Sequence, residues 1–174
     1  MRMLKKFIPN QYVPSIYEID IQELKRLGIK GVITDLDNTL VEWHRKEATE
    51  ELLQWLEELS EEGFEVVIVS NNNEKRVHAF ASPHNITFIH SAKKPFSKAF
   101  KAACKLMGLK HGETVVIGDQ LLTDILGGNR AGFHTILVVP VAETDGILTK
   151  FNRSIERRVF QAMRRRGLIE WEKK

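Results

Sequence analysis

Residues 31–40 read GVITDLDNTL, and this stretch decides how the rest of the chain is interpreted. The run GVIT is uncharged and rich in β-branched side chains, which is typical of a strand buried in a parallel sheet. Asp35 and Asp37 follow it directly. On an extended chain these two carboxylates point the same way, and open parallel sheets bind ligands outside the carboxyl ends of their strands. The hexapeptide DLDNTL therefore predicts a metal site combined with acid–base chemistry, in preference to a solvated turn.

The same alternation of apolar runs and helical patterns continues along the chain. Four more short, β-branched runs are expected to be strands, at residues 65–70, 86–90, 114–119 and 135–141. Helical spacing of apolar residues lies between the strands, at residues 46–62, 75–81, 96–107 and 123–131. This order predicts an α/β fold, a three-layer, Rossmann-like parallel sheet of about five strands with helices on both faces. Ahead of it, Asp20 and Glu23 form a capping pattern for a short helix that ends at Gly28.

Composition limits the class of protein. The chain has 174 residues, of which 43% are hydrophobic and 28% are charged, so a single globular domain is expected. Its one cysteine, Cys104, excludes an internal disulfide and a multi-cysteine metal site, and favours a reducing, cytoplasmic compartment. No apolar run is long enough to predict a spanning helix or a signal peptide.

Both ends differ from the middle. An N-terminal extension, about 1–28, contains MLKKFIPNQYVPSIY, which two prolines make a poor helix and a poor strand. A basic amphipathic helix is expected at about 153–168, with Ile155, Val159 and Met163 along its apolar stripe. Net charge is +3 over residues 1–30, −6 in the middle and +6 over residues 150–174. Basic ends suggest an anionic partner, although solvated tails explain them equally well.

Polar groups also follow the later strands. They are Ser70-Asn71-Asn72 after the second strand, Lys93-Lys94-Pro95 after the third, and Gly118-Asp119-Gln120 after the fourth, with Asp124 five residues beyond Asp119. Each cluster alone is a common turn or helix entrance. Their joint placement at the ends of successive strands predicts one site for a phosphate and a hard cation.

These motifs carry a resemblance. Asp-x-Asp-x-Thr after a strand, then Ser, then Lys-Pro, then Gly-Asp-x4-Asp resembles the haloacid dehalogenase (HAD) superfamily of phosphohydrolases, over roughly residues 31–140. More narrowly, DLDNTLVEW, VSNNNE, AKKP and GDQLLTDILGGNRAG resemble the YqeG family of class III phosphatases, and this likeness extends into FIPNQYVPSIYEI. Asn38 stands where many superfamily members carry glycine, a change that class III members often share.

The resemblance implies a role for each catalytic residue. Asp35 is the expected nucleophile, which forms an aspartyl-phosphate, and Asp37 is the expected general acid and base. The hydroxyl of Ser70 and the backbone of Asn71 are expected to bind the phosphoryl group. Lys94 is expected to neutralise its charge, with Lys93 as the alternative.

The resemblance also implies a cofactor. Mg²⁺ is expected at the Asp35 carboxylate, the Asp37 backbone carbonyl and Asp119, with Asp124 completing the site directly or through water. Thr39 is expected to support the motif loop. Neither the interval between Leu40 and the second strand nor that between Asn71 and Lys94 has room for a large cap domain, so the site should be open.

An open site suits a phosphomonoester carried by something large. The YqeG family resembles enzymes that convert phosphatidylglycerophosphate to phosphatidylglycerol, which predicts a lipid-borne substrate and peripheral contact with anionic membrane at the inner face of the cell membrane. Two alternatives stay open: a phosphatase for a soluble nucleotide or sugar phosphate, and an RNA- or ribosome-associated binding module. Nucleic-acid binding is the weaker, because the basic C-terminus has little aromatic interleaving.

Overall fold

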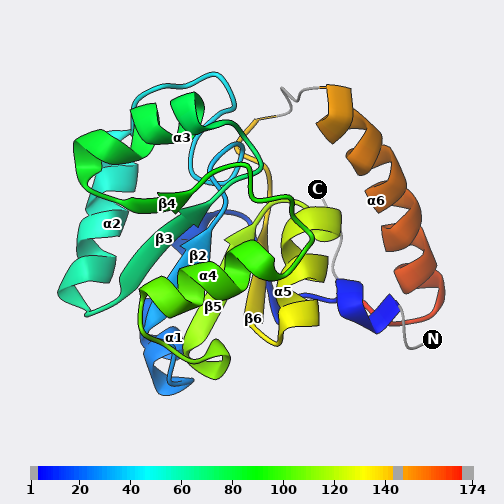
Figure 1. Ribbon diagram of the computed structural model, residues 1–174. Helices are drawn as coiled ribbons and strands as arrows, with labels where there is room; N and C mark the ends of the chain where they lie inside the picture. Colours follow the sequence, from blue (N-terminus) through cyan, green and yellow to red (C-terminus); the bar gives the residue numbers. More distant parts are fainter. Residues whose placement is uncertain (1–3, 143–146, 170–174) are drawn as a thin grey trace.

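Six parallel strands form one sheet in the order β1-β6-β5-β2-β3-β4 (Figure 1). The computed structural model describes residues 4–142 and 147–169. The strands are β1 (Gln11–Val13), β2 (Gly31–Thr34), β3 (Glu65–Val69), β4 (Thr87–Ile89), β5 (Thr114–Gly118) and β6 (His134–Val138). Because all of them run the same way, their carboxyl ends meet at one edge of the sheet, hereafter the carboxyl edge. The predicted α/β parallel sheet is confirmed.

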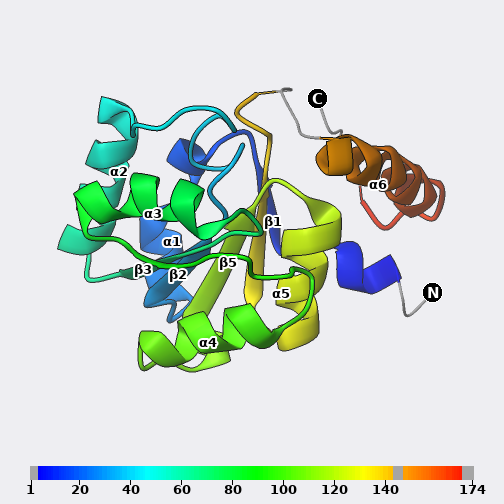
Figure 2. The ribbon, with the colours of Figure 1, turned by 45° about the horizontal axis from the view of Figure 1, so that its top comes forward.

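Helices cover both faces of this sheet, so that the fold has three layers (Figure 2). One face carries α1 (Ile21–Arg26), α2 (Glu50–Glu61) and α3 (Glu74–Ala81), and the other carries α4 (Lys98–Leu106) and α5 (Leu126–Ala131). Short helical turns complete the chain: η1 (Leu4–Phe7), η2 (Ile16–Glu18), η3 (Ser82–His84), η4 (His111–Glu113) and η5 (Leu121–Ile125), the last of them π-helical. Between β2 and β3 the structure places α2 alone, and between β3 and β4 only α3 and η3, so no large cap covers the site.

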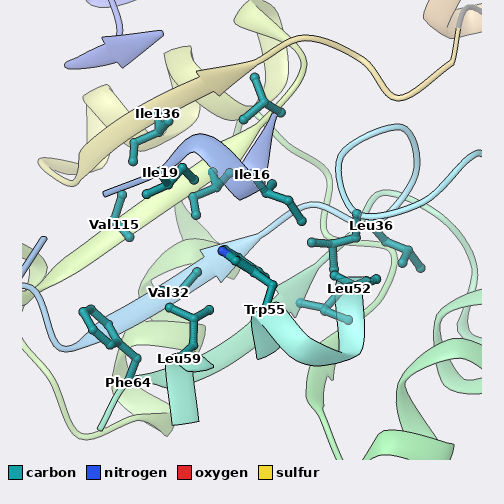
Figure 3. Close-up of a cluster of buried hydrophobic side chains, with 14 of the residues drawn as sticks. Ile16, Ile19, Val32, Leu36, Leu52, Trp55, Leu59, Phe64, Val115 and Ile136 are labelled. Carbon is teal, nitrogen blue, oxygen red and sulfur yellow. The ribbon is translucent and has the colours of Figure 1, made fainter. Parts of the chain in front are cut away.

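The alternation of side chains along β2 explains the two cores. Val32 packs toward α1, α2 and α3, whereas its neighbour Ile33 packs toward α4. On the first face, α2 buries Leu52, Trp55 and Leu59 against the sheet (Figure 3). Full burial of such a side chain is worth about 1.5–3 kcal/mol. The helix begins four residues later than expected, because the Thr49 side chain caps it by accepting a hydrogen bond from the Leu52 amide over 3.1 Å.

The sixth strand, β1, is a finding that the sequence analysis did not anticipate. It comes from the N-terminal extension and pairs only with β6, at the edge of the sheet. Pro9 and Pro14 flank it without interrupting it, and prolines are tolerated at a sheet edge. Asn10 extends the pairing: its amide donates to the Thr135 carbonyl over 2.9 Å and its side chain accepts from the Thr135 amide over 2.8 Å.

The C-terminal helix α6 (Ile147–Arg165) lies along the body of the protein beyond η5 and α5 (Figures 1 and 2). It begins earlier than the expected residue 153, and of the expected apolar stripe Met163 is buried while Val159 is partly buried. Phe160 and Met163 are buried against Leu121 and Ile125, whereas Ile155 is only partly buried. The apolar face of α6 is therefore largely used inside the fold. Among the described residues, no helix combines the length and hydrophobicity needed to cross a bilayer.

Candidate active site

Asp35 and Lys94 meet in the interior of the carboxyl edge. Asp35 follows β2, and its amide donates to the Ile117 carbonyl on β5 over 3.0 Å. The Asp35 carboxylate accepts from the Lys94 ammonium over 2.9 Å and from the Leu36 amide over 2.8 Å. Lys94 also donates to Asp124 over 2.7 Å, and its side chain is only 2% exposed. Lys93 is exposed, so Lys94 is the lysine that reaches the carboxylates.

Three carboxylates converge here. Asp35, Asp119 and Asp124 are all buried, and each offers an oxygen that lies within 4.8 Å of those of the other two. They come from the ends of β2 and β5 and from η5. Hard oxygen donors grouped in this way are the ligands that Mg²⁺ prefers. The side chains therefore fit a divalent cation, and Asp37 lies outside this triad of side chains, as its expected backbone role allows.

Local backbone features bring Asp124 to the triad. Gly118 precedes Asp119, and a Cβ atom at Gly118 would collide with the Asp124 side chain. Asp124 lies on η5, a π-helical turn, and its carboxylate accepts from the Gln120 amide over 3.2 Å. Single π-helical turns are frequent at functional sites. The expected helix thus starts at Leu121 as a π-turn before it continues as α5.

Burial dominates the electrostatics of the triad. Desolvation and the neighbouring Asp35 raise the pKa of Asp119 to about 6, although Arg153 and Thr39 oppose this. Desolvation also raises the pKa of Asp124 to about 7, against the influence of Lys94. Burial by itself lowers the pKa of Lys94, but Asp124 and Asp35 outweigh it and raise that pKa above its ordinary value. The triad thus carries an excess of negative charge that a cation would relieve.

Asp37 is held by a second set of partners on the α3 side. One oxygen accepts from both Nε and a terminal nitrogen of Arg76, over 3.1 and 2.9 Å, and the other accepts from the Asn72 side chain over 2.9 Å. Burial raises the pKa of Asp37, while Asn72 and Arg76 oppose the shift. A raised pKa suits a group that must donate a proton and later accept one.

The remaining expected residues lie around this centre. Ser70 is buried, and its hydroxyl accepts from the Asn72 amide over 3.1 Å. The Asn71 side chain brackets the backbone of Lys94, accepting from its amide over 2.7 Å and donating to its carbonyl over 3.3 Å. Thr39 donates to Asp119 over 2.9 Å. Asn38 adopts a φ of 62°, a conformation that glycine and asparagine accept more readily than other residues.

Two arginines that sequence reasoning did not place in the site also contact its carboxylates. Arg76 pairs with Asp37, as described above. Arg153, which sequence reasoning placed among the basic residues of a C-terminal helix, donates to Asp119 over 2.9 Å. An arginine on a predicted helix is ordinarily interpreted as a solvated charge. For Arg76 the only signal in the sequence was its closeness to the polar cluster that ends a strand, and for Arg153 the sequence offers no signal.

Two surface features adjoin the site. A cavity of about 340 Å³ lies beside the motif loop, lined by Thr39, Leu40 and Val41 together with residues 14–17 and 139–141. Four exposed apolar side chains, which we call the apolar rim, lie on loops or short turns that follow the carboxyl ends of strands. They are Tyr17, Trp43, Phe96 and Val141, which are 37%, 48%, 72% and 51% exposed.

Comparisons with known proteins identify similar sequences. The sequence model of the family described as mitochondrial PGP phosphatase matches residues 1–142. The Bacillus subtilis (strain 168) protein named "Probable phosphatase YqeG" is 57% identical over 171 residues, covering 98% of this chain and 99% of that protein. The Arabidopsis thaliana phosphatidylglycerophosphate phosphatase 1 is 28% identical over 92% of this chain, which spans only 49% of that relative.

A solved structure shows the same fold. The cobalt-bound deoxy-D-mannose-octulosonate 8-phosphate phosphatase from Haemophilus influenzae superposes with a TM-score of 0.55 at 19% identity, covering 79% of this chain and 91% of that one. At this identity the likeness concerns the fold alone. The predicted YqeG-like, HAD-type resemblance is confirmed by the family match and the relatives.

Proposed function

The chain belongs to the mitochondrial PGP phosphatase family of HAD-superfamily phosphatases, and from this premise we propose that it removes the terminal phosphate of phosphatidylglycerophosphate. The observation that carries the proposal is the buried triad of Asp35, Asp119 and Asp124. Lys94 forms ion pairs with Asp35 and Asp124, and Asp37 lies two residues after Asp35. This arrangement supports the proposed roles of Asp35 as nucleophile, of the triad as cation site and of Asp37 as acid–base group, all at one carboxyl edge. The family and the named relatives support the choice of substrate.

The first half of the reaction transfers the phosphoryl group to Asp35. An oxygen of the Asp35 carboxylate attacks phosphorus, and the bond from phosphorus to the leaving oxygen breaks. Asp37 gives its proton to that oxygen, so the product leaves as an alcohol. The raised pKa of Asp37, caused by burial, favours the protonated form that this step needs.

The second half regenerates Asp35. A water molecule gives a proton to the Asp37 carboxylate and attacks phosphorus, and the bond from phosphorus to the Asp35 oxygen breaks, so that inorganic phosphate is released and the Asp35 carboxylate is free again. Lys94, held between Asp35 and Asp124, remains charged and neutralises the phosphoryl oxygens. Asp35, the Asp37 carbonyl, Asp119 and Asp124 would hold Mg²⁺, which would supply further positive charge when bound. Ser70 and the Asn71 backbone hold the phosphoryl group, and Asn71 also fixes the Lys94 backbone.

The apolar rim supports a substrate that resides in a membrane. Tyr17, Trp43, Phe96 and Val141 all follow the carboxyl ends of strands, so they share the edge that holds the carboxylates. Aromatic side chains with one apolar face suit the membrane interface. Exposed arginines on α6 add attraction to anionic lipid, at about 1 kcal/mol for each charge near the surface. We propose that this edge faces the inner leaflet of the cell membrane.

A soluble phosphomonoester is the second candidate, and the cavity of about 340 Å³ beside the motif loop is the observation that favours it. The two candidates are separated by phosphate release from a panel of lipid and soluble phosphomonoesters, with and without Mg²⁺. Preference for phosphatidylglycerophosphate supports the proposal, and preference for a nucleotide or sugar phosphate contradicts it. The buried carboxylates give an RNA-binding module no support.

A further inference from the structure

Helix α6 is docked on the segment that carries two of the three triad residues. Arg153 reaches Asp119 at the end of β5. One turn later, the fully buried Glu156 accepts from the amide of Leu122, near the start of η5, over 3.1 Å. Phe160 and Met163 then pack against Leu121 and Ile125 on the same turn. These contacts hold α6, from Arg153 to Met163, at the border of the site.

The docking gives the arginines of α6 two different positions. Residues four apart lie on the same side of a helix, so Arg157 follows Arg153 on one flank, about 6 Å further along the axis. Arg158 lies on the side that faces away from this flank. Both Arg157 and Arg158 are exposed. Among the described residues, no carboxylate forms an ion pair with either of them.

We infer that Arg153 and Arg157 together recognise a second anionic group of the substrate, a phosphodiester separated from the scissile phosphate by a short linker. The inference rests on the proposed function and deepens it, because phosphatidylglycerophosphate carries a phosphodiester one glycerol away from its terminal phosphate. Guanidinium groups suit this task, since their planar donors match phosphate oxygens.

The position of Arg153 fits this role. Its side chain is 17% exposed while Asp119 is fully buried, so the guanidinium lies between the triad and solvent. The terminal phosphate is expected against Asp35 and Lys94, whereas Arg153 contacts Asp119. A substrate bound there would extend its linker toward α6, where the two arginines lie on successive turns.

The test compares two soluble ligands in an Asp35→Asn background with Mg²⁺, in which turnover is removed. One ligand is the deacylated headgroup of phosphatidylglycerophosphate, with a phosphodiester and a phosphomonoester, and the other is glycerol 3-phosphate, with the monoester alone. Binding of each is measured by calorimetry for the background chain and after Arg157→Gln. Arg158→Gln is the matched control, because it removes the same charge from the other side of the same helix.

We expect the headgroup to bind more tightly than glycerol 3-phosphate, and Arg157→Gln to lower that preference about fivefold, as loss of one partly exposed charged contact would. Arg158→Gln should keep the preference. Equal effects of the two variants, or no preference in the background chain, would overturn the inference. If the inference fails in either of these ways but the active enzyme still hydrolyses phosphatidylglycerophosphate, the proposed function stands without recognition of the phosphodiester by Arg153 and Arg157. Tighter binding of a soluble bisphosphate than of the headgroup would also contradict the commitment to a phosphodiester.

Discussion

Arg153 on the C-terminal helix donates to Asp119 at the end of β5 over 2.9 Å, across 34 positions of the sequence. This contact ties α6 to a carboxylate of the proposed cation site. It also means that the basic C-terminus is part of the architecture of the site, whereas the sequence alone suggested a membrane-docking helix or a solvated tail.

The first prediction concerns stability without metal. Desolvation raises the pKa of Asp119 from 3.8 to about 6, so the folded protein binds more protons than the unfolded chain between these values. Its free energy of unfolding should therefore fall as pH rises through this window, and the loss is complete above it. Asp119→Asn removes this ionisation. At pH 8 in EDTA we expect the variant to be more stable than the wild type by about 1–2 kcal/mol in urea unfolding.

Magnesium should reverse that order. Added Mg²⁺ should raise the unfolding midpoint of the wild type and leave that of Asp119→Asn nearly unchanged. If Asp119→Asn is less stable than the wild type at pH 8 in EDTA, the ion pair between Arg153 and Asp119 stabilises the fold by more than the desolvation of Asp119 destabilises it, and the prediction is contradicted.

The second prediction separates the two chemical steps. Asp37→Asn cannot donate or accept the proton, but a substrate with a good leaving group such as p-nitrophenyl phosphate needs little protonation to phosphorylate Asp35. Dephosphorylation still needs the base and should slow markedly. Mass spectrometry after acid quenching should then find phosphate on the peptide that contains Asp35. An adduct on any other peptide would reassign the nucleophile.

The third prediction concerns Arg76. Burial raises the pKa of Asp37, and Arg76 opposes part of that shift, so Arg76→Gln should raise the pKa further. Phosphorylation by a poor leaving group needs protonated Asp37. The basic limb of kcat/KM against pH for glycerol 3-phosphate should therefore move to higher pH. Lys75→Gln, which removes a neighbouring exposed charge on α3, is the control. A shift to lower pH, or the same shift in both variants, would contradict the assignment.

The fourth prediction tests the apolar rim. Phe96→Ser removes an exposed aromatic side chain at the carboxyl edge, and Leu106→Ser removes an aliphatic side chain of similar exposure at the far end of α4. If the rim contacts the bilayer, Phe96→Ser should lower binding to anionic vesicles several-fold, and Leu106→Ser should not. Sedimentation with vesicles measures this directly. Equal vesicle binding by the two variants would contradict a contact between the apolar rim and the bilayer.

Much of the fold was predictable because its signals are local. The five strands β2 to β6 are apolar runs, and polar clusters follow the first four of them, so the parallel sheet and the grouping of Asp35, Asp119 and Asp124 followed from the order of motifs. Strand β1 was not predictable, because its prolines argue against a strand unless its edge position is known.

The roles of Arg76, Arg153 and Glu156 depend on tertiary contacts. A charged residue on an amphipathic helix ordinarily faces solvent, and nothing in its neighbours along the chain shows that it is buried. Glu156 illustrates this most clearly: it stands between arginines in a basic helix, yet it is fully buried against the amide of Leu122.

The account depends most directly on covalent catalysis by Asp35 on a lipid phosphomonoester. The deciding measurement is release of inorganic phosphate from phosphatidylglycerophosphate in anionic vesicles with Mg²⁺, made in parallel for the wild type and Asp35→Asn. We predict steady release by the wild type and essentially none by the variant, whose circular dichroism should match that of the wild type. Retention of about a tenth or more of the wild-type rate by Asp35→Asn would contradict the account.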